Sequence, residues 1–244
     1  MSGGQELILG ETGTVNDFAG GVTFLDTSVV EVRSRTATGT GAFTFTSTST
    51  ANSVIMLRNN WSGGLFVNDI GVATVGFGKI REEGGDPDRE FSGALSGGGS
   101  LTLEPKDSLW KFIDTNTGTG ALTIQGDGSA NAAFGVEGVF NTYTTISLAN
   151  AAVLNITAAN VIGDSATVAL GTAASFFDVS AGLDEFIGSG LLTVNSVVIP
   201  DGTYTSTESW IEGLGTVTVG IPEPATASLL ALAGVALLKR RRRR

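Results

Sequence analysis

The sequence predicts an all-β fold, a β-solenoid built from short stacked strands, followed by a hydrophobic C-terminal helix. Three observations support this prediction. Short β-prone runs alternate with turn residues, similar runs recur every 21–25 residues, and no sustained 3.6-residue periodicity precedes residue 221. A β-sandwich with the same number of strands is the alternative fold, because short alternating strands are typical of both architectures.

The individual strands are predicted from local alternation. Runs such as 22–25, 43–46 and 72–75 combine Val, Leu or Phe with Thr or Ala, and they are separated by Gly, Asn, Asp, Ser and Thr. Alternation over a few residues, bounded by Gly or Asn, is the signature of a half-buried strand. The 35 glycines supply positive-φ positions for tight corners.

The spacing of these runs predicts how the strands stack. An apolar–small–apolar pattern recurs at steps of 21, 24, 22, 24 and 25 residues, beginning at Leu101, Leu122, Ile146, Val168, Leu192 and Val217. Weaker copies lie upstream, around Val75, Val54, Val30 and Leu7. Repeats of this length indicate a solenoid in which each turn covers the apolar face of its neighbour. Inward Val, Ile, Leu and Phe should then form ladders, with Asn and Thr at the corners.

The composition excludes most familiar catalytic centres. The 244 residues include no His and no Cys. The chain therefore cannot form a Ser–His or Cys–His nucleophile pair, a zinc finger or an iron–sulfur site. Only carboxylates, Lys, Tyr and hydroxyl groups remain for chemistry or metal binding, and we expect no cofactor.

Charge divides the chain at residue 221. The formal net charge is −10, but residues 1–220 hold 8 basic and 23 acidic residues, a balance of −15. Residues 221–244 hold 6 basic residues against one acidic residue, a balance of +5. An acidic surface argues against nucleic-acid binding, since the phosphate backbone needs a basic one. We therefore divide the chain into a body, residues 1–220, and a tail, residues 221–244.

The tail is predicted to contain a short membrane anchor. Residues 225–238 carry no charge, and as a helix they would span about 21 Å of the ~30 Å hydrocarbon core, a difference that bilayer thinning can close. The anchor residues are Ala225, Leu229, Leu230, Leu232, Val235, Leu237 and Leu238, and the basic cluster behind them is Lys239, Arg240, Arg241, Arg242, Arg243 and Arg244. This order is typical of a stop-transfer sequence, with the cations on the cytoplasmic side.

Pro222, Glu223 and Pro224 stand immediately before the anchor. The two prolines remove backbone donors and predict an extended, accessible peptide. This motif, the apolar stretch and the arginine cluster together resemble the sorting tail of PEP-CTERM proteins of Gram-negative bacteria. The resemblance covers the last 24 residues. It implies export, transient anchoring in the inner membrane, cleavage by a membrane-embedded exosortase, and a destination at the cell surface or in an exopolysaccharide biofilm matrix.

The start of the chain does not match this destination. Residues 1–10 contain neither the basic n-region nor the apolar h-region of an export signal. Because the tail implies export, we expect a signal peptide or further domains upstream of Met1.

Parts of the body resemble a second group of bacterial proteins. The similarity is to the autotransporter-associated β-strand repeat, a Gly-rich unit with an Asn-Thr-Tyr turn, in segments 119–124, 140–145 and 154–156. The closing segment of such surface proteins is similar to segments 184–194, 197–205 and 211–219. The resemblance implies a right-handed parallel β-helix like an autotransporter passenger.

Acidic residues are the first candidates for a binding or catalytic site. The candidates are Glu82, Glu83, Asp86 and Asp88 in the most charged stretch of the body, with Asp69 and Asp127 elsewhere. Some β-helix enzymes cleave polysaccharides with carboxylate pairs, as glycosidases do in general. The Gly-Gly-Asp-Pro-Asp sequence favours a solvated loop between two turns instead. The candidates match no calcium-loop spacing, so we expect structural turns and no metal site.

Aromatic residues are the second candidates, because exposed rings can stack on sugars. They are Trp61, Trp110, Trp210, Tyr143 and Tyr204. Their spacing shows no paired platform, which favours packing in the core or at corners. The Gly-rich segment 96–100 is expected to be a loop or short linker, and it is not a phosphate cradle because no helix follows it.

Two functional hypotheses follow. The first is a non-enzymatic exported protein that acts in adhesion or exopolysaccharide scaffolding, through an uncharged Thr/Ser/Asn face that bonds glycans weakly at many points. The alternative is a β-helix glycosidase or lyase that degrades polysaccharides. A groove in which three or more carboxylates converge with a Lys or Arg would favour the enzyme, whereas isolated turn carboxylates would favour the scaffold.

Overall fold

The described part of the chain consists of strands and their connections, with no helix. The structure is a computed structural model. It describes residues 6–10, 19–25, 27–33, 38–48, 53–58, 65–83, 89–106, 109–113, 116–126, 133–136, 140, 142–158, 160–171 and 175–220. The predicted anchor helix, the Pro222–Pro224 motif and the basic cluster lie outside the described residues.

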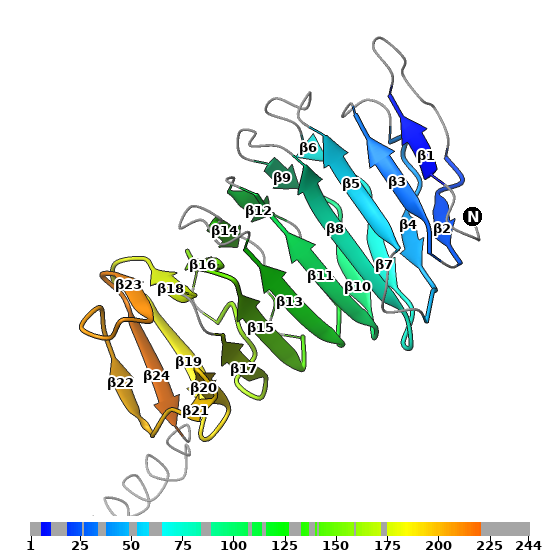
Figure 1. The fold of residues 1–244 in the computed structure, drawn as a ribbon. Coiled ribbons are helices and arrows are strands. Elements are labelled where there is room, and N and C mark those ends of the chain that lie inside the picture. The colour runs from blue at the N-terminus through cyan, green and yellow to red at the C-terminus, as the bar shows by residue number, and fades with distance from the viewer. Residues whose placement is uncertain are drawn as a thin grey trace, which may run out of the picture.

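A ten-stranded sheet runs the length of the body (Figure 1). Its strands, in spatial order, are β1 (Glu6–Leu9), β3 (Val29–Val32), β5 (Val54–Arg58), β8 (Phe77–Glu83), β11 (Ser100–Glu104), β13 (Ala121–Gln125), β15 (Thr145–Ala149), β17 (Thr167–Leu170), β20 (Leu192–Val194) and β21 (Val197–Val198). Every pairing from β1 to β20 is parallel.

Three further sheets complete the body. A seven-stranded sheet contains β6 (Leu65–Phe66), β9 (Arg89–Phe91), β12 (Trp110–Phe112), β14 (Ala133–Val136), β16 (Val153–Ile156), β18 (Phe176–Val179) and β23 (Ile211–Gly213). A four-stranded sheet contains β2 (Val22–Phe24), β4 (Phe43–Phe45), β7 (Ile70–Val72) and β10 (Leu95–Gly97). A three-stranded sheet contains β19 (Asp184–Gly188), β22 (Gly202–Tyr204) and β24 (Thr216–Gly220).

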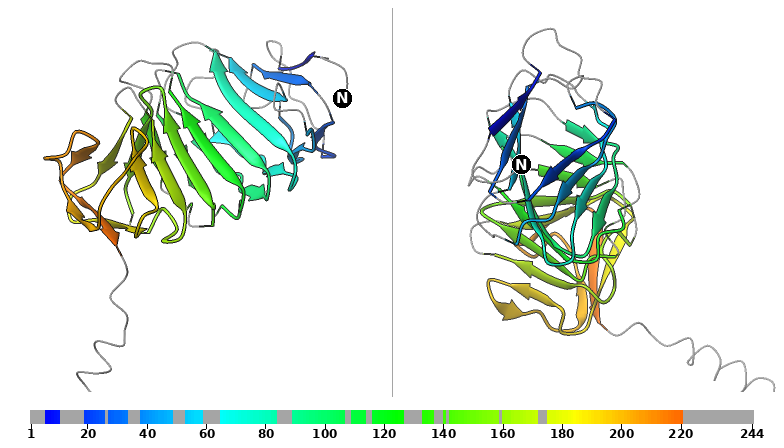
Figure 2. Two further views of the ribbon diagram at one scale, coloured as in Figure 1. Left: turned by 60° about the horizontal axis from the view of Figure 1, so that its bottom comes forward. Right: turned by 90° about the vertical axis from the view of Figure 1, so that its right-hand side faces the viewer.

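The pairing pattern makes the body a parallel β-solenoid. The chain places one strand in the ten-stranded sheet, passes through the other sheets, and returns to the next position of the first sheet, so the strands lie side by side in chain order (Figure 2). The alternative prediction, a β-sandwich, is wrong, because the sandwich needs antiparallel neighbours and the long sheet is parallel over nine successive strands.

The register confirms most of the predicted repeat. Leu101 pairs with Leu122, and the pairing continues through Ile146, Val168 and Leu192. The sixth position was mispredicted: Val217 pairs with Glu185 in the three-stranded sheet. The last parallel strand of the ten-stranded sheet is β20, which is followed by the antiparallel strand β21. A repeat extended at constant spacing therefore predicts one strand too many for this sheet.

The upstream copies were predicted less well. Leu7 pairs with Val30 as expected, but Val30 pairs with Ile55, one residue beyond the expected Val54. Val75 is not in a strand; it lies in the turn after β7 and is 67% exposed. The strand at this place in the sheet is β8, a seven-residue strand that begins at Phe77, two residues after the predicted position.

Ladders of apolar side chains fill the solenoid. Along the ten-stranded sheet, Ile55, Ile80, Leu103, Ile124 and Leu148 are register partners and are no more than 1% exposed. Each such side chain contributes about 1.5–3 kcal/mol of burial free energy. Opposite them are stacked phenylalanine rings, with centroids 4.4 Å apart for Phe24–Phe45 and 4.5 Å apart for Phe91–Phe112.

Asn and Gly form tight corners between the sheets. The buried Asn68 side chain donates to the Gly41 carbonyl at 2.8 Å, and the Asn116 side chain accepts from the Leu95 amide at 2.9 Å. The Gly-rich segment 96–100 was predicted to be a loop, but it holds the end of β10 and the start of β11. Gly97 has φ +96°, and a Cβ on Gly99 would lie 2.2 Å from the Ala73 carbonyl oxygen, so neither position accepts a side chain.

Antiparallel strands close the C-terminal end. β20 and β21 form a hairpin whose two turn residues, Asn195 and Ser196, have φ 51° and 65°, as a type I′ turn requires. β22 pairs antiparallel with β24 at the edge of the three-stranded sheet. Short antiparallel edge strands of this kind hinder further strand addition.

No helix within the described residues is long and apolar enough to cross a membrane.

Candidate functional site

The first acidic candidate, Glu82, is inside the solenoid. It occupies an inward position of β8, next to Leu57 in the ladder, and is 3% exposed. One carboxylate oxygen accepts from the Arg89 guanidinium at 2.8 and 3.0 Å. The other accepts from the Trp110 indole at 3.1 Å and from the Lys106 amide at 3.3 Å. Both oxygens are therefore occupied by protein donors.

This network is structural. It ties β8 to β9 and β12 across segment 84–88, and the Glu82 and Arg89 side chains are 0% and 2% exposed. The expectation that Glu82 belongs to a solvated loop is therefore wrong: the alternation of β8 continues to Glu83 and puts Glu82 on the inner face. Asp86 and Asp88 lie outside the described residues.

Glu83 lies on the outer face, in a cluster that we call the charged face. Its members are Glu31, Arg33, Arg58, Lys79, Arg81, Glu83 and Glu104. Arg58 bonds both Glu31 and Glu83 on the neighbouring strands, and Arg33 bonds Glu31 at 2.5 Å. Burial opposes ionisation of Glu31, but the hydrogen bonds from Arg33 and Arg58 outweigh it and hold the pKa of Glu31 below its usual value.

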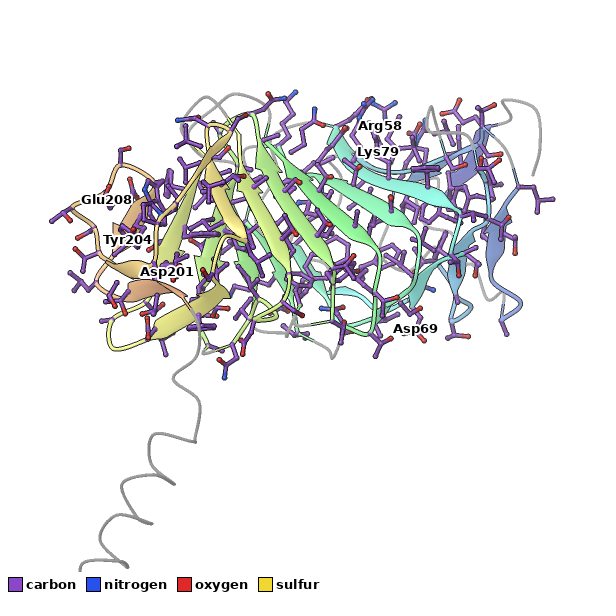
Figure 3. The ribbon with its side chains drawn as sticks, turned by 90° about the horizontal axis from the view of Figure 1, so that it is seen from below. Arg58, Asp69, Lys79, Asp201, Tyr204 and Glu208 are labelled. Atoms are coloured by element: carbon purple, nitrogen blue, oxygen red, sulfur yellow. The ribbon has the colours of Figure 1, made fainter. Side chains whose placement is uncertain are left out.

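The other half of the charged face is built in the same way. Glu104 on β11 accepts from Lys79 at 2.5 Å and from Arg81 at 2.6 Å, both on β8. Each carboxylate thus faces one or two cations one strand away. Figure 3 shows Arg58 and Lys79 on the same side of the body. This arrangement pairs opposite charges between strands, and each carboxylate of the charged face bonds a cation of the protein itself.

The sequence contains a signal for these ion pairs, because oppositely charged residues recur at the length of the repeat. Arg58 and Glu83 are register partners 25 residues apart, and Arg81 and Glu104 are register partners 23 residues apart, one solenoid turn in each case. Opposite charges at one repeat length lie opposite each other in a parallel sheet. A search for charges separated by the repeat would have found both pairs.

The remaining acidic candidates form no shared site. Asp69 is exposed, and its side chain accepts from the Ala94 amide at 3.0 Å, which joins two turns. It lies on another side of the body from Arg58 and Lys79 (Figure 3). Asp127 lies outside the described residues. Among the residues that the structure describes, no three Asp or Glu side chains are grouped to hold a metal ion.

The aromatic candidates that are described pack against the protein. Trp110 is fully buried, and Tyr143 is buried over Gly118, where burial raises the pKa of its hydroxyl. Tyr204 and Trp210 pack together at 5.3 Å between centroids near the C-terminal end. Figure 3 shows Tyr204 near Asp201 and Glu208. Trp61 lies outside the described residues.

One buried carboxyl was not predicted. Glu185 on β19 is fully buried and accepts from the Val161 and Ile162 amides at 3.1 and 2.7 Å. Burial raises the pKa of Glu185 to about 7. The two amide hydrogen bonds lower the pKa but offset only part of this effect, and the nearby charges of Asp164 and Asp184 raise it further. The group titrates near neutrality, and its side chain is enclosed by the protein.

A further surface feature is an uncharged strip on the ten-stranded sheet, which we call the hydroxyl face. It comprises Ser100, Thr102, Ala121, Thr123, Thr145, Ser147, Thr167, Ala169 and Thr193, at outward positions of β11, β13, β15, β17 and β20. The outward residues of β13, β15 and β17 include no charged side chain. This face has the arrangement needed to hydrogen-bond a neutral surface at several points.

Comparison with known proteins supplies no relative: no protein-family model, curated protein or solved structure matches the chain.

Proposed function

We propose that the chain is an exported bacterial surface or extracellular-matrix protein that acts without catalysis in adhesion or exopolysaccharide scaffolding. The hydroxyl face carries this proposal. A stack of parallel strands presents small uncharged hydroxyl side chains in register, whereas the described carboxylates of the charged face and core bind cations or backbone amides of the protein itself.

The proposed route to the surface uses the tail. Pro222-Glu223-Pro224 would be the exosortase recognition segment, residues 225–238 would hold the protein transiently in the inner membrane, and Lys239 to Arg244 would stay on the cytoplasmic side. The support is the order of these three features. A right-handed winding is part of the same proposal, because parallel strand crossovers are right-handed in most proteins.

The sorting proposal is tested in a host that has an exosortase. With Pro222→Ala and Pro224→Ala, the protein should stay uncleaved in the membrane fraction, because the extended recognition segment is lost. The matched control is Pro200→Ala, which changes a proline in the body and should leave cleavage intact. Normal release of the double variant would overturn the sorting proposal.

The alternative enzymatic function has a direct test. The body, residues 1–220, is incubated with neutral and acidic polysaccharides, and new reducing ends and unsaturated products are measured. We expect neither product, because the described carboxylates of the charged face and of the core are engaged within the protein. If the protein releases sugars at a constant rate per mole, the proposed scaffold function is wrong and the protein is a glycosidase or lyase.

A further inference from the structure

The hydroxyl face consists of two parallel columns. Thr102, Thr123, Ser147, Ala169 and Thr193 are successive register partners and form the first column. In the second column, two residues before the first on each strand, Ala121, Thr145 and Thr167 are register partners, and Ser100 precedes them on β11. The columns run along the solenoid axis, with one residue of each on β11, β13, β15 and β17, and the first column alone continues to β20.

The hydroxyl groups of these columns are available to a ligand. Thr193 donates a long bond of 3.4 Å to the Val168 carbonyl. Of the other described hydroxyl side chains on this face, none has a hydrogen bond to the described protein, in contrast to Thr142 and Thr144 at a corner, which bond carbonyls at 2.7 and 3.1 Å. A hydroxyl group that is half-exposed and has no protein partner keeps both its donor and its acceptor capacity for a ligand.

The electrostatic surroundings select a neutral ligand. The face has no charge of its own, and at its N-terminal end it meets Glu104, whose carboxylate bonds both Lys79 and Arg81. The body as a whole carries a balance of −15, so an anionic polymer is repelled over a long range, whereas a neutral one is not. Thr methyl groups and Ala side chains between the hydroxyls can contact the apolar faces of sugar rings.

The spacing of the columns selects an extended ligand. Neighbouring strands are about 4.8 Å apart, which is close to the length of one pyranose residue in an extended β-linked chain. A glycan that lies along the axis therefore meets a new pair of small side chains with each sugar. A glycan that lies parallel to a strand meets only the two columns.

We propose that the hydroxyl face binds a neutral, extended β-linked polysaccharide lying along the solenoid axis, at about one sugar per strand. This proposal rests on the proposed scaffold function and specifies its ligand class and binding surface. Each hydroxyl contributes weakly, so affinity comes from the number of strands engaged, as in other multivalent contacts. The five strands β11, β13, β15, β17 and β20 limit that number.

The test uses the full chain and two double variants with matched chemistry. Thr123→Val with Ser147→Ala removes two adjacent hydroxyls from the face. Thr44→Val with Ser96→Ala removes the same groups from outward positions of the four-stranded sheet. Val and Ala keep the strand geometry, and circular dichroism with thermal melting confirms that each variant is folded.

Binding is measured by affinity electrophoresis in gels that contain hydroxyethyl cellulose or alginate, and by titration with β-1,4-linked gluco-oligosaccharides of increasing length. We expect retardation by the neutral polymer and not by alginate, and an affinity about tenfold lower for the first variant and unchanged for the second. Affinity should rise with oligosaccharide length up to about five sugars and then level off.

Three outcomes would overturn the inference. Equal loss in both double variants would remove the hydroxyl face as the binding surface. A plateau at two sugars would place the glycan parallel to a strand. Retardation by alginate alone would contradict the neutral ligand. If the protein is exported and retained in a biofilm matrix in any of these cases, the scaffold function stands without this inference; failure of export and retention would instead refute the proposed function.

Discussion

The two ends of the ten-stranded sheet present different outer surfaces on the same backbone. Toward the N-terminus, β3, β5, β8 and β11 carry the charged face, where Arg58 contacts one carboxylate on each neighbouring strand and Glu104 contacts two cations on β8. Toward the C-terminus, β13, β15 and β17 carry only Thr, Ser, Ala and Gln outward. The pairing is parallel throughout, so hydrogen bonding of the backbone does not require either surface.

This difference indicates that packing of the inward side chains, and not the outer ion pairs, stabilises the solenoid. If outer ion pairs were needed for strand pairing, β13 to β17 could not pair as they do. What both ends share is the inner ladder of Ile and Leu. The outer surface is then available for function, and its charge can change along one molecule without a change of fold. The comparison leads to four predictions about stability.

Loss of the inner ion pair at the charged end should have the largest effect. In Arg89→Met, the Glu82 carboxylate stays buried without its cation, and we expect the free energy of unfolding to fall by about 3–5 kcal/mol in urea denaturation. Adding Glu82→Leu to this variant should recover most of the loss, because the buried charge is removed. If Arg89→Met alone costs under 1 kcal/mol, the network is not a structural element.

A pH dependence should arise from Glu185 at the C-terminal end. Its pKa is about 7 in the folded protein against an ordinary value of 4.5, so the folded state binds the proton more tightly. Protonation of Glu185 therefore stabilises the folded state. This contribution to the free energy of unfolding is fully present below about pH 4.5 and is lost as pH rises through 7, a decrease of up to roughly 3 kcal/mol.

The measurement for Glu185 is the difference in unfolding free energy between the wild type and Glu185→Gln from pH 4 to 8. The variant has no carboxyl to titrate, so the difference should shift in its favour as pH rises, over and above any constant cost of replacing an acceptor of two amides. Asp201→Asn, at an exposed site, is the control. A difference that is flat with pH would contradict the raised pKa.

Outer ion pairs should contribute less. Glu104→Gln removes the partner of Lys79 and Arg81, which are 28% and 41% exposed, and we expect a loss of about 0.5–1 kcal/mol. The loss should fall further in 1 M salt because the charges are screened. A loss above 2 kcal/mol, unaffected by salt, would mean that the charged face does hold the sheet together.

Changes on the hydroxyl face should affect stability least. Thr123→Val keeps a β-branched side chain at a half-exposed strand position, so the free energy of unfolding should change by no more than about 0.5 kcal/mol. Thermal melting of this variant beside Ile124→Ala gives the contrast, since the neighbouring inward residue should cost about 2–5 kcal/mol. Similar losses in both would contradict the separation of inner and outer roles.

Local alternation was sufficient to predict the repeat but not its ends. The positions from Leu101 to Leu192 are register partners because each turn has nearly the same length and the same apolar pattern. Val217 has that pattern too, yet the hairpin of β20 and β21 ends the sheet before it. The apolar pattern predicts which residues can form a strand, but the sheet in which that strand pairs depends on the neighbouring strands.

The carboxylates show a similar limit. Glu82 and Glu83 are adjacent in a charged stretch, and composition alone places both in solvent. In β8 they point to opposite faces, so Glu82 meets Arg89 and Trp110 inside while Glu83 meets Arg58 outside. The buried partners come from later strands, β9 and β12, which approach Glu82 only in the folded solenoid.

The sequence by itself determined the fold class, the length of the solenoid turn and the residues of most inner ladders, because burial of every second residue at a constant step requires that pattern. It also holds the tail motif on which the proposed export rests. Only the tertiary structure decided which charges are enclosed, where the sheet ends, and which hydroxyls align without protein partners. The bonds of Lys79 to Glu104, of Trp110 to Glu82 and of Ile162 to Glu185 join residues 23 or more positions apart, and such contacts exist only after the turns have stacked.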